Sequence, residues 1–124
     1  MMEKGLSAQS KVTVDGGNVA ATMGSGDLQV FATPAMVALM ENAAMKAVAD
    51  HLPEGSTTVG AEMNVTHIKP SGVGAEIVAS AVLTEVEGRK LTSNVGARDA
   101  EGMIGEGVHV RYVVDREKFM SKVR

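Results

Sequence analysis

The fold is constrained most by one long apolar helix that precedes four strand-like segments. Thr33 and Pro34 form a start signal, with Thr33 suited to the N-cap and Pro34 to the first helical position. Ala, Leu and Met dominate from Ala35 to about Asp50, and the sequence LPEG from Leu52 ends the helix. Because this helix is apolar nearly all round, we expect it to be covered on most of its faces.

After the helix, the sequence alternates with a period of two. The pattern predicts strands over 57–68, 75–85, 91–98 and 103–114, with a bend in the last strand near Gly105 and Gly107. Short connections predict that consecutive strands are antiparallel neighbours. Residues 11–15 and 18–23 predict two short strands before the helix, and 115–123 predict a terminal helix. A curved sheet wrapped around the helix would bury it, so we expect an α+β fold in a single domain over residues 1–124.

Composition excludes several classes of protein. The chain has 124 residues, a net charge of −3, no cysteine and only 2% aromatic residues. Scattered basic residues and scarce aromatic ones argue against a nucleic-acid surface. The longest apolar stretch, 43–49, is interrupted by Lys46 and falls far short of the ~20 residues that cross a bilayer. With no apolar stretch near the N-terminus, we expect a cytoplasmic protein without membrane association.

Glu41 is the first candidate for chemistry, because it lies within the apolar helix. Its helical neighbours carry no cation; they are Pro34, Val37, Ala38, Ala44, Met45 and Val48. Burying an unpaired carboxylate is costly, so Glu41 is hydrogen-bonded, exposed at the edge of the sheet, or kept for function.

His67 is the second candidate. If strand 57–68 is regular, His67 shares an apolar face with Val59, Ala61, Met63 and Val65 and points toward the helix. It would there meet Glu41, a ligand or a backbone carbonyl. Thr33 and Glu41 lie ~12 Å apart along a helix that begins at Pro34. They would touch only if the helix begins later or if one of them comes from a partner subunit.

The last predicted strand carries two more polar side chains, which lie on the same face. His109 and Arg111 alternate with Val108, Val110 and Tyr112, which predicts that the polar pair faces solvent. His51 falls in the last turn of the helix, where the helix dipole favours a cation, and we assign it no function. Three scattered histidines without a carboxylate cluster predict no metal site.

Four stretches of the chain resemble a known family. They are VFATPAMVALMENAAMKAV from Val30, VGAEMNVTHIKPSG from Val59, LTEVEGRKLTSNVGARD from Leu83 and IGEGVHVRYVVDREKF from Ile104. In this order they resemble hotdog-fold thioesterases, most closely the fluoroacetyl-CoA thioesterase-like family. The signatures of the hydratase and of the acyl-carrier dehydratase branches are absent from the sequence.

The resemblance implies a curved antiparallel sheet around a central helix, in a homodimer or an assembly of dimers with active sites at the subunit interface. It implies that Thr33, Glu41 and His67 match the three catalytic positions of the family. Gly60 and Arg111 match positions associated with substrate binding. The expected partner is an acyl-CoA substrate, and no separate cofactor is implied.

We therefore expect an acyl-CoA thioesterase that acts on a small or medium acyl group. Glu41 would activate water or attack the carbonyl, and Thr33 would position water or act as a nucleophile. His67 would bond the acyl carbonyl and handle a proton, and the Gly60 N–H is a candidate oxyanion donor. The alternatives are a non-catalytic acyl-CoA binding protein of the same fold and an interaction module with a vestigial pocket.

One segment departs from the family pattern. The fluoroacetate-specific enzyme has phenylalanines before the helix that form a lid over the acyl group, whereas residues 23–29 here contain no aromatic side chain. We therefore expect no strong preference for fluoroacetyl-CoA.

Overall fold

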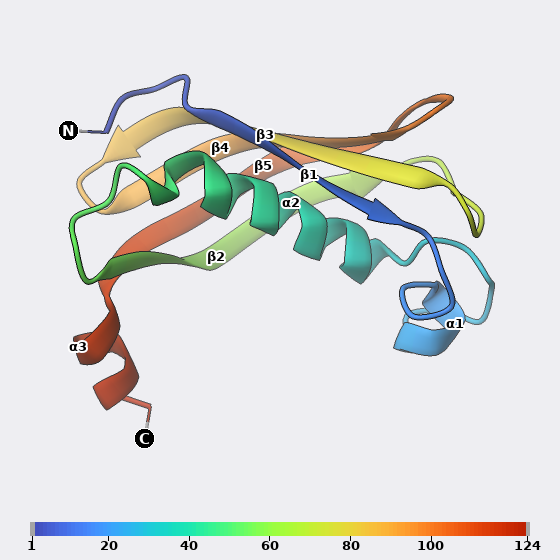
Figure 1. Cartoon of the computed structure of the whole chain (residues 1–124), viewed down its shortest axis with the longest axis horizontal. Helices are drawn as coiled ribbons and strands as arrows, with labels where there is room; N and C mark the ends of the chain where they lie inside the picture. The colour runs from blue at the N-terminus through green and yellow to red at the C-terminus, as the bar shows by residue number, and fades with distance from the viewer. Residues whose placement is uncertain (1, 124) are drawn as a thin grey trace.

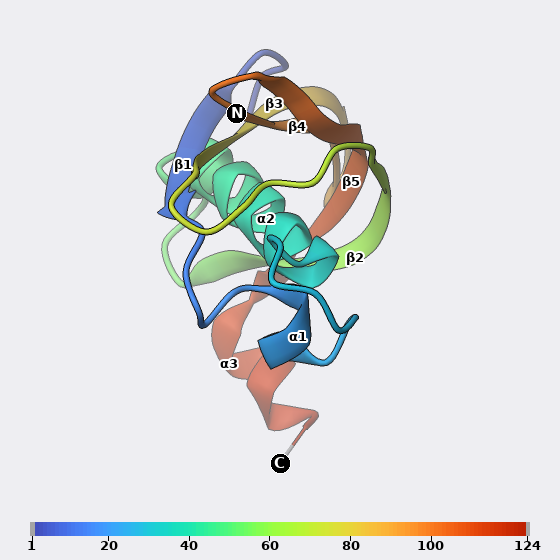
Figure 2. The same cartoon turned by 90° about the vertical axis from the view of Figure 1, so that its right-hand side faces the viewer.

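The computed structural model describes residues 2–123, which form one five-stranded antiparallel sheet curled around a long helix (Figures 1 and 2). The strands are β1 (Ser7–Thr13), β2 (Ser56–His67), β3 (Glu76–Glu87), β4 (Lys90–Asp99) and β5 (Gly102–Asp115). The helices are α1 (Ala20–Met23), α2 (Thr33–Ala49) and α3 (Arg116–Ser121). None of the helices among these residues has the length and apolar character needed to cross a bilayer.

Helix α2 lies across the concave face of the sheet and buries one stripe of side chains. The stripe consists of Met36, Met40, Ala43, Ala44, Ala47 and Val48. It meets small residues of β3 and β4, including Ala79, Ala81 and Ala97, which allow the helix to approach the sheet closely. Ala38, Asn42 and Met45 on the other side of α2 are exposed. The expectation of cover on most faces is therefore wrong for a single chain.

The N-terminus of α2 differs from the prediction by one position. Ala32 is the N-cap and Thr33 is the first helical residue, and the cap makes no side-chain hydrogen bond. The prediction that Thr33 caps the helix is therefore wrong, and its hydroxyl is available for another contact. At the other end, α2 stops at Ala49, so His51 lies in the turn after the helix.

The strand order is β1-β3-β4-β5-β2, which confirms four antiparallel strands after α2 but corrects one predicted pairing. β3, β4 and β5 are consecutive neighbours, whereas β2 pairs with β5 and not with β3. The segment between β2 and β3 instead passes the N-terminal side of α2, where the Phe31 N–H donates to the Ser71 carbonyl at 2.9 Å. This order leaves β1 and β2 as the two edges of the sheet.

The segment 18–23 is also corrected, because most of it forms the single-turn helix α1 rather than a strand. Ala20 and Ala21 favour a helix, and Gly24 ends it in the left-handed region with φ of 77°. Only Val19 is extended, in an isolated bridge to Phe31.

The predicted bend region of β5 is the place where β2 approaches most closely. A Cβ at Gly105 would collide with the Thr66 carbonyl and with the Met36 sulfur, and one at Gly107 would collide with the Asn64 carbonyl. These two glycines therefore let β5 pack closely against β2 and, at Gly105, against Met36 of α2.

Candidate active site

Thr33 and His67 form the first of two polar clusters on the concave face. The Thr33 Oγ1 atom, at the start of α2, lies 2.8 Å from His67 Nδ1, at the end of β2. A hydroxyl this close to an imidazole can act as a nucleophile, with the imidazole as its base. It can also hold a water molecule that the imidazole deprotonates. The predicted direction of His67 toward the helix is thus correct, but its partner is Thr33 and not Glu41.

The environment of His67 favours its uncharged ring. Burial lowers the pKa of His67, and the nearby Lys69 backbone only partly opposes this effect. Its second nitrogen, Nε2, is buried and has no hydrogen-bond partner within residues 2–123. Because Nε2 exposes almost no surface, a bound molecule could reach it only after a local rearrangement.

A bulge in β2 changes which residues face the helix. The register against β5 shifts between Gly60 and Glu62, so β2 is not a regular strand over its whole length. As a result Thr58 is buried on the concave side, and Gly60 faces Glu41. The expectation that Val59 and Ala61 share the helix-facing side with His67 is therefore wrong. Met63 and Val65 pack against the core as expected. A glycine inside a strand pattern is a typical signal of such a bulge.

Glu41 belongs to the second cluster, where its partner is Arg111. Glu41 Oε2 lies 3.5 Å from Arg111 Nη1 and 3.9 Å from His109 Nε2, and 41% of the Glu41 side chain is exposed. No helical neighbour of Glu41 is a cation, so its charge is matched by Arg111 from β5. Glu41 is therefore a half-buried carboxylate that is accessible on one side and paired on the other.

Arg111 is buried and held from three directions. Its Nε donates to Thr58 Oγ1 at 2.8 Å and its Nη2 to the Thr58 carbonyl at 2.9 Å. Its Nη1 lies 3.1 Å from His109 Nε2, and only 7% of the residue is exposed. The prediction that His109 and Arg111 face solvent is wrong, because the concave face of β5 must supply the partners that Glu41 needs.

His109 has a defined tautomer, which follows from its two partners. Its Nδ1 lies 2.7 Å from the Glu62 carbonyl, which can only accept, so Nδ1 carries the proton. Nε2 then accepts from Arg111, which can only donate. Burial lowers the pKa of His109, and the Arg111 charge lowers it further, so the ring stays neutral. His109 thus fixes the Arg111 guanidinium that faces Glu41.

Gly60 makes room for the carboxylate. A Cβ at this position would collide with Glu41 Oε2 and would also approach His109 Cε1 at 3.3 Å and Arg111 Nη1 at 3.4 Å. Any larger residue would push Glu41 away from the guanidinium. Gly60 is a candidate from the sequence, whereas the part that His109 and Thr58 play in this cluster could not be predicted from it. The sequence signal for a cationic partner was Glu41, because a carboxylate on a covered helix requires a cation nearby.

The structure places the two clusters apart within one chain. Thr33 and Glu41 are eight residues apart on one continuous helix, which corresponds to ~12 Å along its axis. Gly60 and His67 are seven residues apart on β2, which corresponds to ~23 Å of extended strand. A single chain therefore brings Thr33 to His67 and Glu41 to Arg111, but does not join the three predicted catalytic residues.

An ionic cluster fixes the chain just after His67. Lys69 Nζ lies 2.7 Å from Asp99 Oδ2, Ser71 Oγ donates to the same oxygen at 2.8 Å, and the Glu101 N–H donates to Asp99 Oδ1 at 2.9 Å. The Lys69 hydrogen bond, followed by that of Ser71, lowers the pKa of Asp99 to about 2. The cluster anchors the β2–β3 connection to the turn between β4 and β5.

Asp99→Asn should lower the free energy of unfolding by about 1–2 kcal/mol at pH 7, because charged hydrogen bonds are lost. The folded pKa of Asp99 lies below its ordinary value of 3.8, so its contribution is present above pH 4 and is lost as pH falls toward 2. Urea unfolding at pH 7, 4 and 2.5 measures this, with the exposed Asp27→Asn as control. Equal pH dependence of Asp99→Asn and the wild type would contradict the role of this cluster.

Known proteins to which this chain is similar are thioesterases. The profile of the fluoroacetyl-CoA-specific thioesterase family matches residues 14–117. The fluoroacetyl-CoA thioesterase of Streptantibioticus cattleyicolor is 43% identical over 96 residues, which are 77% of this chain and 69% of that protein.

Solved structures show the same similarity. A fluoroacetyl-CoA thioesterase structure has a TM-score of 0.92 and 34% identity, covering 100% of this chain and 96% of that one. A threonine-to-serine variant of such an enzyme in complex with acetyl-CoA has a TM-score of 0.94 and 33% identity, covering 99% of this chain and 97% of that one. The hotdog fold and the thioester hydrolase class expected from the sequence are thereby confirmed. The chain belongs to the fluoroacetyl-CoA-specific thioesterase family.

Proposed function

We propose that this protein hydrolyses a small or medium acyl-CoA thioester to the free acid and CoA. The observation that carries the proposal is the Glu41 carboxylate, which is exposed on one side and held on the other by the buried Arg111. The complex of a family member with acetyl-CoA supports an acyl-CoA as substrate.

Glu41 acts on the attacking group. In the water route, water adds to the thioester carbonyl carbon as Glu41 takes one of its protons, and the C–S bond then breaks. The CoA thiolate leaves and recovers that proton. Alternatively, Glu41 attacks the carbonyl carbon and the C–S bond breaks, which releases the CoA thiolate and leaves an acyl-glutamyl anhydride. Water then hydrolyses this anhydride to the free acid and the Glu41 carboxylate, and the proton released from water goes to the thiolate. Arg111 orients the carboxylate in either route.

Thr33 and His67 act on the carbonyl side. The neutral His67 and the Thr33 hydroxyl are within hydrogen-bond distance of each other, so together they can orient water and transfer a proton. The Gly60 N–H remains our candidate donor to the oxyanion. In this chain the space at Gly60 is taken by Glu41 Oε2, which supports a role in admitting the carboxylate.

We place the complete site between two chains of a homodimer. β2 is an edge strand of 12 residues, and a long unpaired edge readily pairs with a second copy. If two β2 strands pair antiparallel about a two-fold axis between Met63 and Asn64, Gly60 lies opposite the partner's His67. This arrangement brings Glu41 to the Thr33–His67 cluster of the other chain, which one chain alone cannot do.

A hydrolysis screen over acyl-CoAs of increasing chain length, with the released thiol measured, tests the activity. We expect turnover of at least one small or medium acyl-CoA. Saturable binding without thiol release would instead identify a binding protein, and no binding to any acyl-CoA would leave an interaction module. We further propose a single domain in the cytoplasm that needs no metal or separate cofactor.

Fluoroacetyl-CoA should not be strongly preferred over acetyl-CoA. Residues 23–29 carry no aromatic side chain, and Leu28 among them is largely exposed, whereas Phe31 just after them is buried in the core. Discrimination of one small group by a pocket usually provides only ~1–3 kcal/mol, and a segment without a lid should provide less. The ratio of the two kcat/KM values measures this preference. A ratio of several thousand would mean that another feature replaces the aromatic lid.

A further inference from the structure

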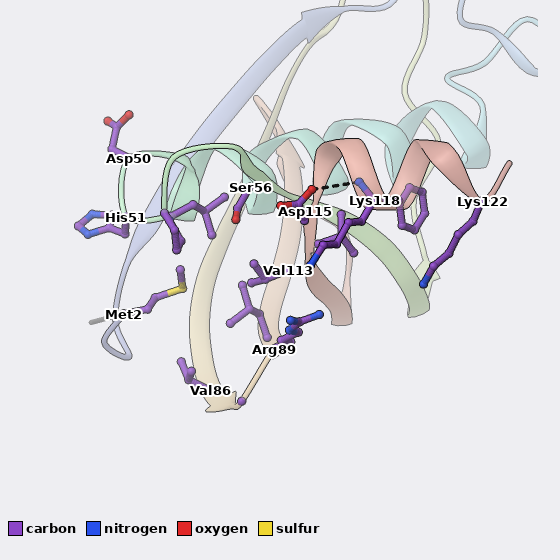
Figure 3. A pocket seen from close by; sticks show the side chains of 16 residues that line it. Met2, Asp50, His51, Ser56, Val86, Arg89, Val113, Asp115, Lys118 and Lys122 are labelled. Carbon is purple, nitrogen blue, oxygen red and sulfur yellow. Dashed lines mark hydrogen bonds between the residues drawn. The ribbon is translucent and has the colours of Figure 1, made fainter. Parts of the chain in front are cut away.

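A large cavity lies at the C-terminal end of α2, away from Thr33 and His67. It has a volume of about 1170 Å³. Figure 3 shows it between the turn after α2, the start of β2, the end of β5 and helix α3. Its size is at the upper end of typical ligand sites. Neither of the two clusters described above uses this space.

Cations dominate the rim of this cavity. Arg89, Lys118 and Lys122 line it, and none of them forms an ion pair within the described part of the chain. Figure 3 shows Arg89 and Lys118 extending toward the same part of the groove. Of the two lining carboxylates, Asp115 accepts from the Lys118 N–H at 3.0 Å as the N-cap of α3. The cavity thus has excess positive charge in a chain whose net charge is −3.

The cavity also provides an aromatic surface. Phe119 of α3 lines it and is 38% exposed, although the chain has only three aromatic residues. Unpaired cations beside an exposed ring suit a nucleotide, because Lys and Arg bind phosphate and an aromatic ring stacks on a base.

The cavity lies near the Glu41 cluster along β2 and β5, although no residue of that cluster lines it. Val113 and Ser56 line it, and each lies two residues from a member of the Arg111–Thr58 pair on the same strand. Residues two apart share a face and lie ~7 Å apart, so the cavity begins where this pair ends. Along α2, Glu41 and Asp50 are separated by ~14 Å. The pantetheine arm of CoA can occupy this interval.

We propose that this cavity binds the 3′-phosphorylated ADP portion of the CoA substrate. Arg89, Lys118 and Lys122 contact its phosphates, and Phe119 stacks on its adenine. The inference rests on the proposed acyl-CoA hydrolysis and adds the location of the nucleotide. In the opposite direction along β2, Met63 and Val65 pack against the apolar core, which offers no site for phosphates.

The Lys118→Gln/Lys122→Gln double variant tests this site. KM for the best acyl-CoA should rise on the order of five- to tenfold with kcat unchanged, because exposed charged contacts to phosphate are lost. KM for the corresponding acyl-pantetheine, which lacks the nucleotide, should stay the same. Lys4→Gln/Lys11→Gln, which removes two exposed lysines outside the cavity, is the matched control.

A second measurement separates this inference from the proposed function. Calorimetric titration with adenosine 3′,5′-bisphosphate should show binding to the wild type and weaker binding to the Lys118→Gln/Lys122→Gln variant. Hydrolysis with an unchanged KM, or an equal rise with acyl-pantetheine, would overturn the nucleotide site while the thioesterase activity stands. If no acyl-CoA is hydrolysed, the titration still decides, and unaltered binding in the variant would overturn the site.

Discussion

Glu41→Gln should lower kcat for the best acyl-CoA by at least ~10²-fold, the usual scale of general-base catalysis. Glutamine keeps the size of the side chain and a carbonyl oxygen near Arg111, but it cannot accept a proton or attack the thioester. Substrate binding should change little, so the loss should appear in kcat rather than in KM. Steady-state kinetics with thiol detection measure both constants.

The fold of this variant should be intact, because 41% of the Glu41 side chain is exposed and its partner is held mainly by Thr58 and His109. Circular dichroism and urea unfolding check this. Glu85→Gln, an exposed position on β3, is the matched control and should have wild-type kinetics. Wild-type turnover in Glu41→Gln would refute the proposed chemistry and leave Glu41 as a surface carboxylate.

The helix and the strands could be predicted from the sequence because their signals are local. Ala, Leu and Met over one long segment, and alternation after Gly55, depend only on neighbouring residues. The pairing of β2 with β5 has no such signal, since an eight-residue connection between β2 and β3 permits either order. The prediction of consecutive neighbours therefore failed at this one connection.

The catalytic and binding roles of Thr33, Glu41, His67, Gly60 and Arg111 stay predictions, and the contacts that these residues make could not be predicted. Alternation shows that His109 and Arg111 share a face, but it does not tell which face is inside. Polarity suggested the outer face, whereas the need of Glu41 for a cation required the inner one. Similarly, the bulge at Gly60 inverted the assignment of the first half of β2, because one additional residue moves every side chain before it to the other face.

The separation of the two clusters predicts a second large effect on activity. This effect should appear in dimers that combine two different variants. Glu41→Gln and His67→Ala chains, co-expressed with different affinity tags and purified over both, form a heterodimer. If each site takes Glu41 from one chain and His67 from the other, one of the two sites contains both native residues. We expect about half of the wild-type activity, whereas each homodimer should retain ~1% or less.

The reciprocal heterodimer is the matched control, because it contains the same two substitutions in a different arrangement. It pairs a wild-type chain with a chain that carries both Glu41→Gln and His67→Ala. If the sites are shared between chains, each of the two sites then lacks one native residue, so activity should fall to ~1%. A site within one chain predicts the opposite pair of results, since the wild-type chain would keep its own complete site. Sedimentation equilibrium must first show a dimer, and a stable monomer of 12.9 kDa at micromolar concentration would exclude the shared site. Because Thr33 and His67 touch within one chain while Glu41 lies ~12 Å along the helix, we expect the shared arrangement.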